Sequence, residues 1–307
     1  MNTAVVTGAG GFIGRHLCAR LVAEGWTVKV ITRGTAPANT QMLKTALDAE
    51  NNELVGGFLN AQVVYHLAGL AHEGVAHNNR AALQGVNVNG TVSVIKAAVE
   101  AAVPAVVWLS SIKVLGDVSD DPFRPEDPYR PGNAYAQSKM AAELALAGIC
   151  TGSTRVAIVR PPLVYGAGVR GNYLRMLHWV ARGIPLPLAH ATALRSMVSA
   201  ANLCDLLVRL SQDGAGVFHV ADSEDMSVSV LLAELAMLLG HRLLLFGVPP
   251  KVMQFLTAAG RQRVVYSRLF DPLQVDQSAT REALGWHPPF TAREQMAATV
   301  EWFQQQR

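Results

Sequence analysis

The chain has 307 residues, of which half are hydrophobic and 16% are charged, so it can bury a sizeable core and wholesale disorder is excluded. The 26 basic and 23 acidic side chains leave a net charge of +3 with no basic block, which argues against a dedicated nucleic-acid surface. The cysteines (Cys18, Cys150 and Cys204) are odd in number, which argues against a disulfide framework and favours a reducing compartment.

The placement of the apolar stretches argues against export and membrane insertion. The strand-like run Thr3–Thr7 begins almost at once, which leaves no room for a signal peptide before it. The most apolar region, Val228–Leu245, is interrupted by Glu234 and Arg242, and Gly240 is a helix stop. It predicts a buried helix followed by a strand, not a membrane span. We therefore expect a cytoplasmic protein without stable membrane insertion.

The first half of the chain alternates short runs of β-branched residues with stretches of helical period. This rhythm predicts right-handed crossovers and a parallel sheet. The runs are apolar on both faces, which is typical of strands covered by helices on both sides. We predict an α/β fold with a doubly wound parallel sheet. The predicted strands are Thr3–Thr7, Thr27–Thr32, Gln62–Leu67, Ala105–Ser110 and Arg155–Arg160, and the predicted helices are Ile13–Glu24, Arg80–Ala102 and Ala134–Gly148.

The rhythm changes after Arg160, where segments rich in proline and glycine alternate with shorter elements. One further strand is predicted at Gly216–Val220. We interpret residues 1–161 as one domain built on the sheet and residues 162–307 mainly as a smaller lobe. The lobe is interleaved with the last strand of the sheet, near residues 216–220. The chain has no internal repeats, so a solenoid is not supported.

A glycine-rich loop comes after the first predicted strand. From Thr7 the chain reads Gly-Ala-Gly-Gly-Phe-Ile-Gly and then continues as a helix. Spaced glycines suit a tight turn, a backbone that a pyrophosphate can approach, and close packing of helix on strand. The helix N-terminus offers free N–H groups to phosphates. A glycine turn without a ligand is the alternative, which this context disfavours. The candidate cofactor-binding residues of the loop are Gly8, Gly11, Phe12, Ile13 and Gly14.

The turn after the second strand bears on the choice of cofactor. An NAD-binding fold usually places an acidic residue there for the ribose 2′-hydroxyl. This chain instead has Thr32, Arg33 and Gly34. An arginine can pair with a 2′-phosphate, which favours NADP(H) and leaves NAD(H) open. A solvated loop arginine is the alternative interpretation.

A group of polar side chains predicts the chemistry. Tyr135 and Lys139 are one helical turn apart, so both project from one helix face. Ser110 and Ser111 come after a strand at the carboxyl edge of the sheet, where α/β folds bind ligands. A lysine ammonium stabilises a phenolate and brings the pKa of the tyrosine toward the working range. A serine hydroxyl can orient a carbonyl. We predict that Ser111, Tyr135 and Lys139 catalyse hydride chemistry at a carbon–oxygen centre.

The order and spacing of the motifs resemble the extended short-chain dehydrogenase/reductases of the NAD-dependent epimerase/dehydratase family. The resemblance covers essentially the whole chain. It implies a Rossmann-type domain, a nicotinamide cofactor, a C-terminal lobe that grips a nucleotide sugar, and a homodimer. It also implies cofactor contacts from Leu67, Ala68, Asn87, Tyr135 and Lys139. The matching motifs are Thr7–Gly14, His66–Gly69, Asn87–Thr91, Ser110–Gly116, Tyr135 with Lys139, Arg160–Gly166 and Leu284–Trp286.

Details within this family discriminate between reactions. Its 4,6-dehydratases carry an Asp-Glu pair directly after the catalytic hydroxyl, whereas this chain has Ile112 and Lys113, which cannot transfer those protons. Its 4-epimerases usually keep an acidic residue after the second strand, and this residue is missing. The segments 110–114, 171–173 and 184–188 are most similar to 4-keto-sugar-nucleotide reductases, many of which are labelled 4-epimerases.

The resemblance leaves three hypotheses for the function. The first is an NAD(P)H-dependent reductase of the C4 keto group of a nucleotide-linked 4-keto-6-deoxy sugar, of the UDP-N-acetylhexosamine type, for surface polysaccharide. The second is a UDP-hexose 4-epimerase with tightly bound NAD. The third is a non-catalytic NADP-sensing protein, which the presence of both Tyr135 and Lys139 disfavours.

The resemblance also implies substrate contacts. Asn172 and Arg195 match residues that relatives use on the sugar diphosphate, and an arginine fork suits that geometry. Lys113 could reach the diphosphate or the sugar, with a structural role as the alternative. The histidines at 72 and 77 are five residues apart, which does not suit a metal site on one helix face, so no metal is predicted.

Overall fold

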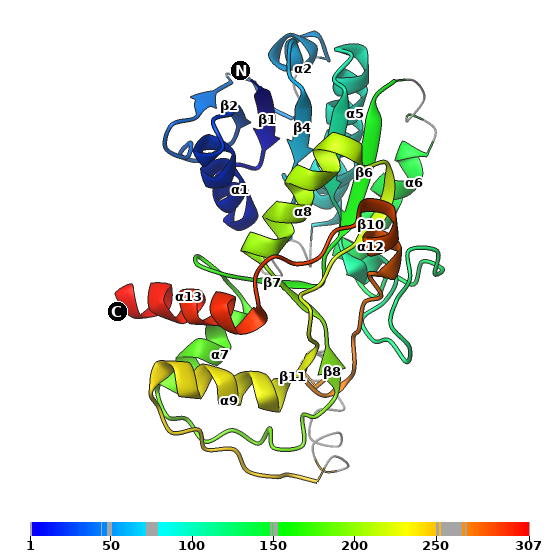
Figure 1. Ribbon diagram of the computed structural model, residues 1–307. Helices are drawn as coiled ribbons and strands as arrows, with labels where there is room; N and C mark the ends of the chain where they lie inside the picture. Colours follow the sequence, from blue (N-terminus) through cyan, green and yellow to red (C-terminus); the bar gives the residue numbers. More distant parts are fainter. Residues whose placement is uncertain are drawn as a thin grey trace.

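A computed structural model describes residues 2–43, 45–47, 51–71, 79–147, 149, 153–249, 252, 266–267 and 269–306. Its centre is a seven-stranded sheet in the order β10-β6-β5-β4-β1-β2-β3, in which every pair of neighbours is parallel (Figure 1). The predicted parallel α/β sheet is confirmed. The strands are β1 (Thr3–Thr7), β2 (Thr27–Ile31), β3 (Gln41–Met42), β4 (Val63–His66), β5 (Ala105–Leu109), β6 (Arg155–Arg160) and β10 (Gly216–His219).

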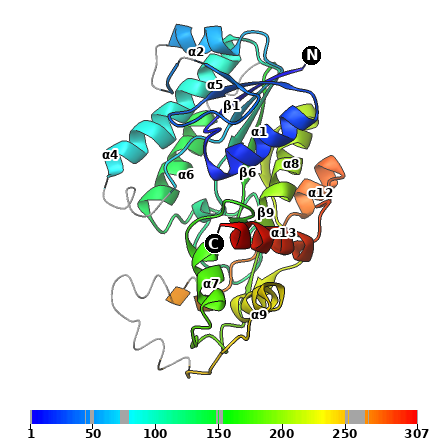
Figure 2. The ribbon, with the colours of Figure 1, turned by 90° about the vertical axis from the view of Figure 1, so that its left-hand side faces the viewer.

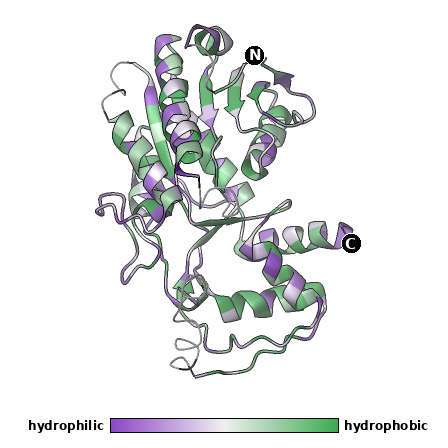
Figure 3. Cartoon of the chain, turned by 180° about the vertical axis from the view of Figure 1, so that it is seen from behind, coloured by the Kyte–Doolittle hydropathy of each residue, from purple (hydrophilic) through white to green (hydrophobic). Residues whose placement is uncertain are grey.

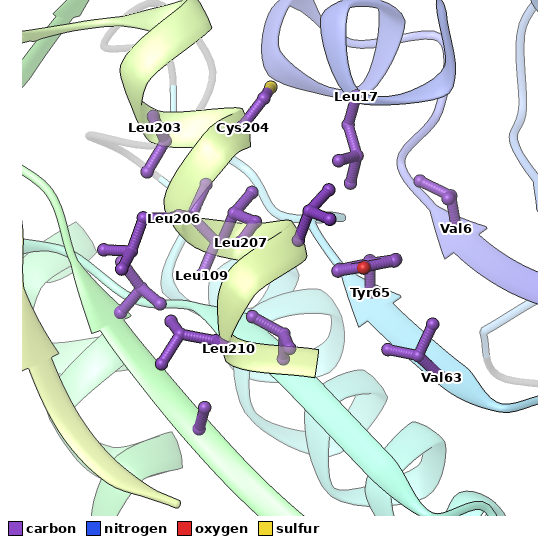
Figure 4. Close-up of a cluster of buried hydrophobic side chains, with 14 of the residues drawn as sticks. Val6, Leu17, Val63, Tyr65, Leu109, Leu203, Cys204, Leu206, Leu207 and Leu210 are labelled. Carbon is purple, nitrogen blue, oxygen red and sulfur yellow. The ribbon is translucent and has the colours of Figure 1, made fainter. Parts of the chain in front are cut away.

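Helices cover both faces of the sheet, as the two-sided apolar strands predict. Figure 2 shows α2 (Asn51–Phe58), α5 (Gly90–Glu100) and α6 (Ala134–Leu146) on one side, with α1 (Phe12–Ala23) and α8 (Ala200–Asp213) on the other. Side chains alternate along each strand, so one buried cluster forms under each layer. Figure 4 shows the cluster beneath α1 and α8.

A second body, the C-terminal lobe, lies beyond the carboxyl edge of the sheet (Figure 1). It has its own buried cluster, built from α7 (Asn172–Ala181), α9 (Val228–Leu239) and α13 (Ala292–Gln305). The apolar inner faces of these helices are visible in Figure 3. The remaining short strands are β7 (Leu163–Tyr165), β8 (Leu194–Arg195), β9 (Met197–Ser199) and β11 (Met226–Ser227). The short helix α12 (Ser278–Leu284) packs beside β10 of the central sheet.

The chain passes between the two bodies more than once. After α7 and β8 it returns to the sheet as α8 and β10, and β10 pairs with β6 along Gly216–His219. It then re-enters the lobe at β11 and α9. The strand predicted near residues 216–220 is therefore the edge strand of the central sheet. Among the described residues, no helix combines the length and apolarity needed to cross a membrane.

Two predicted elements differ from the structure. The helix predicted at Arg80–Ala102 is divided into α4 (Arg80–Leu83), a π-helical stretch (Gln84–Asn89) and α5. Such π-turns often accompany functional sites, and this one carries a buried Asn87 whose amide forms hydrogen bonds outside the helix. The predicted helix at 134–148 ends at Leu146, and Gly148 lies outside the described residues.

The strand predicted after Gly240 is wrong. Gly240 ends α9 in the left-handed conformation, and the next segment forms a single β-bridge between Leu186 and Leu245. None of residues 241–249 is fully buried, so burial does not favour an extended strand there.

Candidate active site

The loop between β1 and α1 is packed so tightly that its glycines are required. Gly8 has a φ of +72°, and a Cβ there would lie 2.6 Å from the backbone nitrogen of Ala68. A Cβ on Gly10 would lie 2.8 Å from Oγ1 of Thr32, and one on Gly14 would collide with the carbonyl oxygen of Gly8. The loop is therefore held directly against the segments that come after β2 and β4.

The N-terminus of α1 is open to an anion. Its N-cap is Gly11, so no side chain caps the helix N–H groups, and the first turn has no acidic residue. Free N–H groups and the positive end of the helix dipole at this position fit dinucleotide phosphates. Ile13 packs against the cluster under the sheet and Phe12 against the cluster of the lobe, so the loop contacts both bodies.

Arg33 lies in the turn after β2 and is exposed. The preceding Thr32 contacts the glycine loop and accepts a hydrogen bond from the backbone N–H of Gly34 at 3.2 Å. No described residue forms a hydrogen bond or ion pair with the Arg33 guanidinium, and the sequence has no carboxylate between residues 28 and 47. The guanidinium is therefore available to a phosphate beside the loop.

Asn87 ties the loop after β4 to the helix that carries the tyrosine and lysine. Its amide accepts a hydrogen bond from the Leu70 N–H at 2.8 Å and donates to the Leu70 carbonyl at 3.1 Å. It also donates to Oγ of Ser138 on α6 at 2.9 Å. Leu67 and Ala68 lie in the same loop. These contacts hold the loop in place, and a cofactor contact of Asn87 stays a prediction.

His66 is fully buried between two threonines. Its Nδ1 hydrogen bonds with Oγ1 of Thr7 at 2.7 Å and its Nε2 with Oγ1 of Thr91 at 3.0 Å. Burial, together with the nearby charge of Lys139, lowers the pKa of His66 to about 3. The ring is neutral and fully engaged, so it is a packed histidine and not a base.

The three residues predicted to be catalytic come together where β5 meets α6. Asn133 caps α6 by accepting from the Ala136 N–H at 3.0 Å, which sets the first turn that carries Tyr135. Ser111 comes after β5, and its hydroxyl interacts with the Tyr135 phenol so as to lower the pKa of that phenol. Lys139 is buried and donates from Nζ to the Leu109 carbonyl at the end of β5, at 2.8 Å.

The ionisation of this group differs from the expectation. The sequence predicts that Lys139 brings the pKa of Tyr135 toward neutrality, but burial raises that pKa to about 12, opposed only by the hydrogen bond with Ser111. The ammonium of Lys139 donates to a carbonyl and lies 5.1 Å from the centre of the Trp108 ring. Burial lowers the pKa of Lys139 to about 8. In this site, desolvation is therefore the largest influence on the pKa of both groups.

A buried ion pair beside the site is absent from the sequence-based prediction. The Glu143 and Arg160 side chains are 1% and 3% exposed, and Nη2 of Arg160 lies 2.6 Å from Oε2 of Glu143. Glu143 also accepts hydrogen bonds from the hydroxyls of Ser110 and Tyr129. The available signal is spacing, because Glu143 comes one helical turn after Lys139.

Comparison with known proteins assigns the chain to a family. The family model described as the NAD dependent epimerase/dehydratase family matches residues 4–221. The chain belongs to this family. A UDP-glucose 4-epimerase of Vibrio cholerae is 33% identical to it over 99% of the chain and 96% of that protein. A ketoreductase of Stigmatella aurantiaca that acts on a farnesylated quinoline oxide is 27% identical over 71% of the chain and 67% of that protein.

Solved structures of this epimerase/dehydratase family agree with the fold. MoeE5, solved in complex with UDP-glucose and NAD, matches with a TM-score of 0.81 and 27% identity over 99% of both chains. A UDP-N-acetylglucosamine 4-epimerase from Methanobrevibacter ruminantium has a TM-score of 0.81 at 19% identity, which supports the fold alone. The predictions of a Rossmann-type fold and of an NAD-dependent nucleotide-sugar oxidoreductase or epimerase are confirmed at the level of the family.

The predicted substrate residues of this family member lie on separate elements. Lys113 comes two residues after Ser111, and its Nζ lies 3.8 Å from Oδ1 of Asp117. Asn172 begins α7 and accepts a hydrogen bond from Arg175 at 2.8 Å. Arg195 lies in β8.

The guanidinium of Arg195 donates to the carbonyls of Asp271 and Ser267. Among the described residues there is no group of three or more His, Cys, Asp or Glu side chains that could hold a metal ion. The pair at 72 and 77 lies outside these residues.

Proposed function

We propose that this enzyme reduces the C4 keto group of a nucleotide-linked 4-keto-6-deoxy sugar, of the UDP-N-acetylhexosamine type, for surface polysaccharide. The observation that carries the proposal is the environment of Ser111. The next side chains are a buried Ile112 and a cationic Lys113, so the two positions after the catalytic hydroxyl carry no carboxylates to transfer the protons that elimination of water requires.

The ionisation of Tyr135 supports the direction of the reaction. With a pKa of about 12 the phenol is protonated at neutral pH, so it can donate a proton to a keto oxygen that becomes an alkoxide. Ser111 donates to the same oxygen and orients it. When bound, the nicotinamide cofactor supplies the hydride for C4. Lys139 stabilises the phenolate that Tyr135 becomes once the proton has moved.

Arg33 supports NADPH as the cofactor. Its exposed guanidinium stands beside the glycine loop with no described partner and no neighbouring carboxylate to repel a 2′-phosphate. A reductase consumes a diffusible cofactor, and NADPH is the nicotinamide cofactor that such a site accepts. For the substrate, we propose that Lys113, Asn172 and Arg195 contact the sugar diphosphate, because they offer cationic and amide donors near Ser111 or on the lobe.

Assembly and location also belong to the proposal. We propose a cytoplasmic homodimer that pairs through α5 and α6. The support on this surface is Leu144 of α6, whose side chain is 56% exposed. Association that removed this side chain from water would be favourable.

A UDP-hexose 4-epimerase is the second candidate, and the observation that favours it is the 33% identity to the Vibrio cholerae 4-epimerase over nearly the whole chain. The test is NADPH oxidation by the purified enzyme with a UDP-4-keto-6-deoxy-N-acetylhexosamine made in situ by a dehydratase. A reductase consumes one NADPH per keto sugar and is purified without cofactor. Interconversion of UDP-hexoses by a protein that carries bound NAD, with no net NADPH oxidation, would select the epimerase.

A further inference from the structure

Glu143 is a buried carboxylate to which neither proposed function gives a role. It lies on α6, one turn after Lys139, and its side chain is 1% exposed. Its two oxygens accept hydrogen bonds from Ser110, from Tyr129 at 2.8 Å and from Arg160 at 2.6 to 3.2 Å. These donors fix the position of the carboxylate.

Side chains on the same face of α6 form hydrogen bonds with two consecutive residues at the end of β5. Lys139 donates to the carbonyl of Leu109, and Glu143 accepts from the hydroxyl of Ser110. The next residue is Ser111, whose hydroxyl acts on Tyr135 by lowering the pKa of the phenol. The two side chains therefore fix both the position of Ser111 and its approach to the tyrosine.

Arg160 completes the arrangement from β6. Its Nη1 donates to the Pro125 carbonyl at 2.9 Å, and its guanidinium lies 5.3 Å from the centre of the Tyr129 ring. The pair thus joins the ends of β5 and β6 to the loop that leads into α6. A buried ion pair is often no more stabilising than apolar residues of the same volume, so stability alone is a weak explanation for it.

We propose that Glu143 is a positioning residue that keeps Lys139 in its ammonium form and holds the Ser110–Ser111 end of β5 against the catalytic helix. The proposal rests on the use of Lys139 as a cation beside Tyr135, which a reductase and an epimerase share. Arg160 holds the Glu143 carboxylate in place.

The groups around Lys139 leave Glu143 as the one described anion that acts on it. From β4 it faces His66, which is neutral, and from β5 the Trp108 ring and the Leu109 carbonyl. From its own helix it faces Tyr135, which is protonated at neutral pH, and Glu143. Burial lowers the pKa of Lys139 to about 8, and the charge of Glu143 opposes that fall. Without Glu143, the Lys139 pKa would fall further, and the charged fraction of Lys139 near neutrality would fall with it.

The test reads Lys139 directly. The chain has six lysines, so NMR of isotope-labelled lysine side chains, assigned with a Lys139→Met variant, gives the Lys139 pKa in the full-length protein. Glu143→Gln keeps the size and removes the charge, so it should lower this pKa by about one unit or more, whereas Glu143→Asp should restore most of the loss. An unchanged Lys139 pKa in Glu143→Gln would overturn the proposal.

Asp205 provides a matched control. It also pairs with an arginine, Arg20, at 2.8 Å and accepts from an aromatic donor, Trp286, at 2.7 Å, but it lies on α8. Asp205→Asn should lower stability and leave the Lys139 pKa unchanged. If this control moves the pKa as far as Glu143→Gln does, the effect is general destabilisation and the proposal fails.

A double variant covers the case in which Glu143→Gln does not fold because Arg160 is left buried and unpaired. Glu143→Gln with Arg160→Gln removes both charges, and its Lys139 pKa should be about one unit lower than in Arg160→Gln alone, because that comparison isolates the charge of Glu143. In kinetics, the fall of kcat at high pH should move to lower pH in Glu143→Gln and return in Glu143→Asp. The NMR titration uses no substrate, so a failure of the proposed reaction leaves this result standing, and the reverse is also true.

Discussion

Charge reversal at Arg33 tests the choice of cofactor most directly. The guanidinium is exposed, so a contact with a 2′-phosphate is partly screened, and we take the lower half of the range for charge-assisted hydrogen bonds. Loss of that contact costs about 1.5–2 kcal/mol, or about 10- to 30-fold in affinity. Repulsion between the new carboxylate and the phosphate adds to this cost. Arg33→Asp should therefore shift the preference for NADPH over NADH by about 100-fold.

The assay compares kcat/KM for NADPH and NADH at one fixed concentration of keto sugar and at two ionic strengths. The NADPH penalty should shrink at high salt, because the contact is exposed. Arg182→Asp is the control, since it reverses an exposed arginine at the end of α7, away from the glycine loop. A wild-type enzyme that prefers NADH, or an unchanged ratio in Arg33→Asp, would refute the assignment.

Four further predictions rest on the described contacts. Tyr135→Phe should lower kcat by about 10²- to 10⁴-fold and leave the cofactor Kd nearly unchanged, because the lost hydroxyl acts on the transition state. If kcat by stopped-flow and the cofactor Kd by fluorescence titration changed by the same factor, Tyr135 would not be the proton donor. Gly8→Ala, at a φ of +72° and against the Ala68 backbone, should lower the free energy of unfolding by about 1–3 kcal/mol and abolish cofactor binding, as urea titration and calorimetry would measure. Leu144→Glu should weaken the dimer by about 10- to 100-fold in sedimentation, whereas an unaltered mass would exclude α6 from the interface. His66 stays neutral in the fold, so below pH 6.5 only the unfolded chain protonates this histidine. The free energy of unfolding should therefore fall by about 1.4 kcal/mol per pH unit between pH 6.5 and the folded pKa of about 3. In urea titrations over this range, His66→Asn should reduce that slope.

The parts of the fold that could be predicted are those in which the local pattern and tertiary burial agree. The strands at Thr3–Thr7 and Arg155–Arg160 match the prediction at both ends. A run rich in β-branched residues and buried on both faces favours the strand over other conformations. The helix at 80–102 is less predictable, since its interruption depends on amide bonds from Asn87 to a distant loop and to α6. Periodicity carries no information about such partners.

The candidate site shows the same division. The glycine loop and the spacing of Tyr135 and Lys139 are local patterns, and the structure brings Ser111 to them. The Glu143–Arg160 pair joins side chains 17 residues apart on a helix and a strand. Both side chains are buried, whereas glutamate and arginine are usually exposed, so the sequence does not predict this pair. The ionisation of Tyr135 also depends on how completely the fold excludes water, which spacing along a helix does not report.

The return of the chain to the sheet makes the two bodies one folding unit. A fragment that stopped at residue 161 would lack α8 and β10, which would expose the edge of β6 and the apolar face that α8 covers. Such an open strand edge is a template for aggregation. The C-terminal lobe, in turn, would lose Phe12, which reaches it from the glycine loop. We expect a single unfolding transition in which the two bodies unfold together. We also expect slow folding, because β10 pairs with a strand that is distant in the sequence.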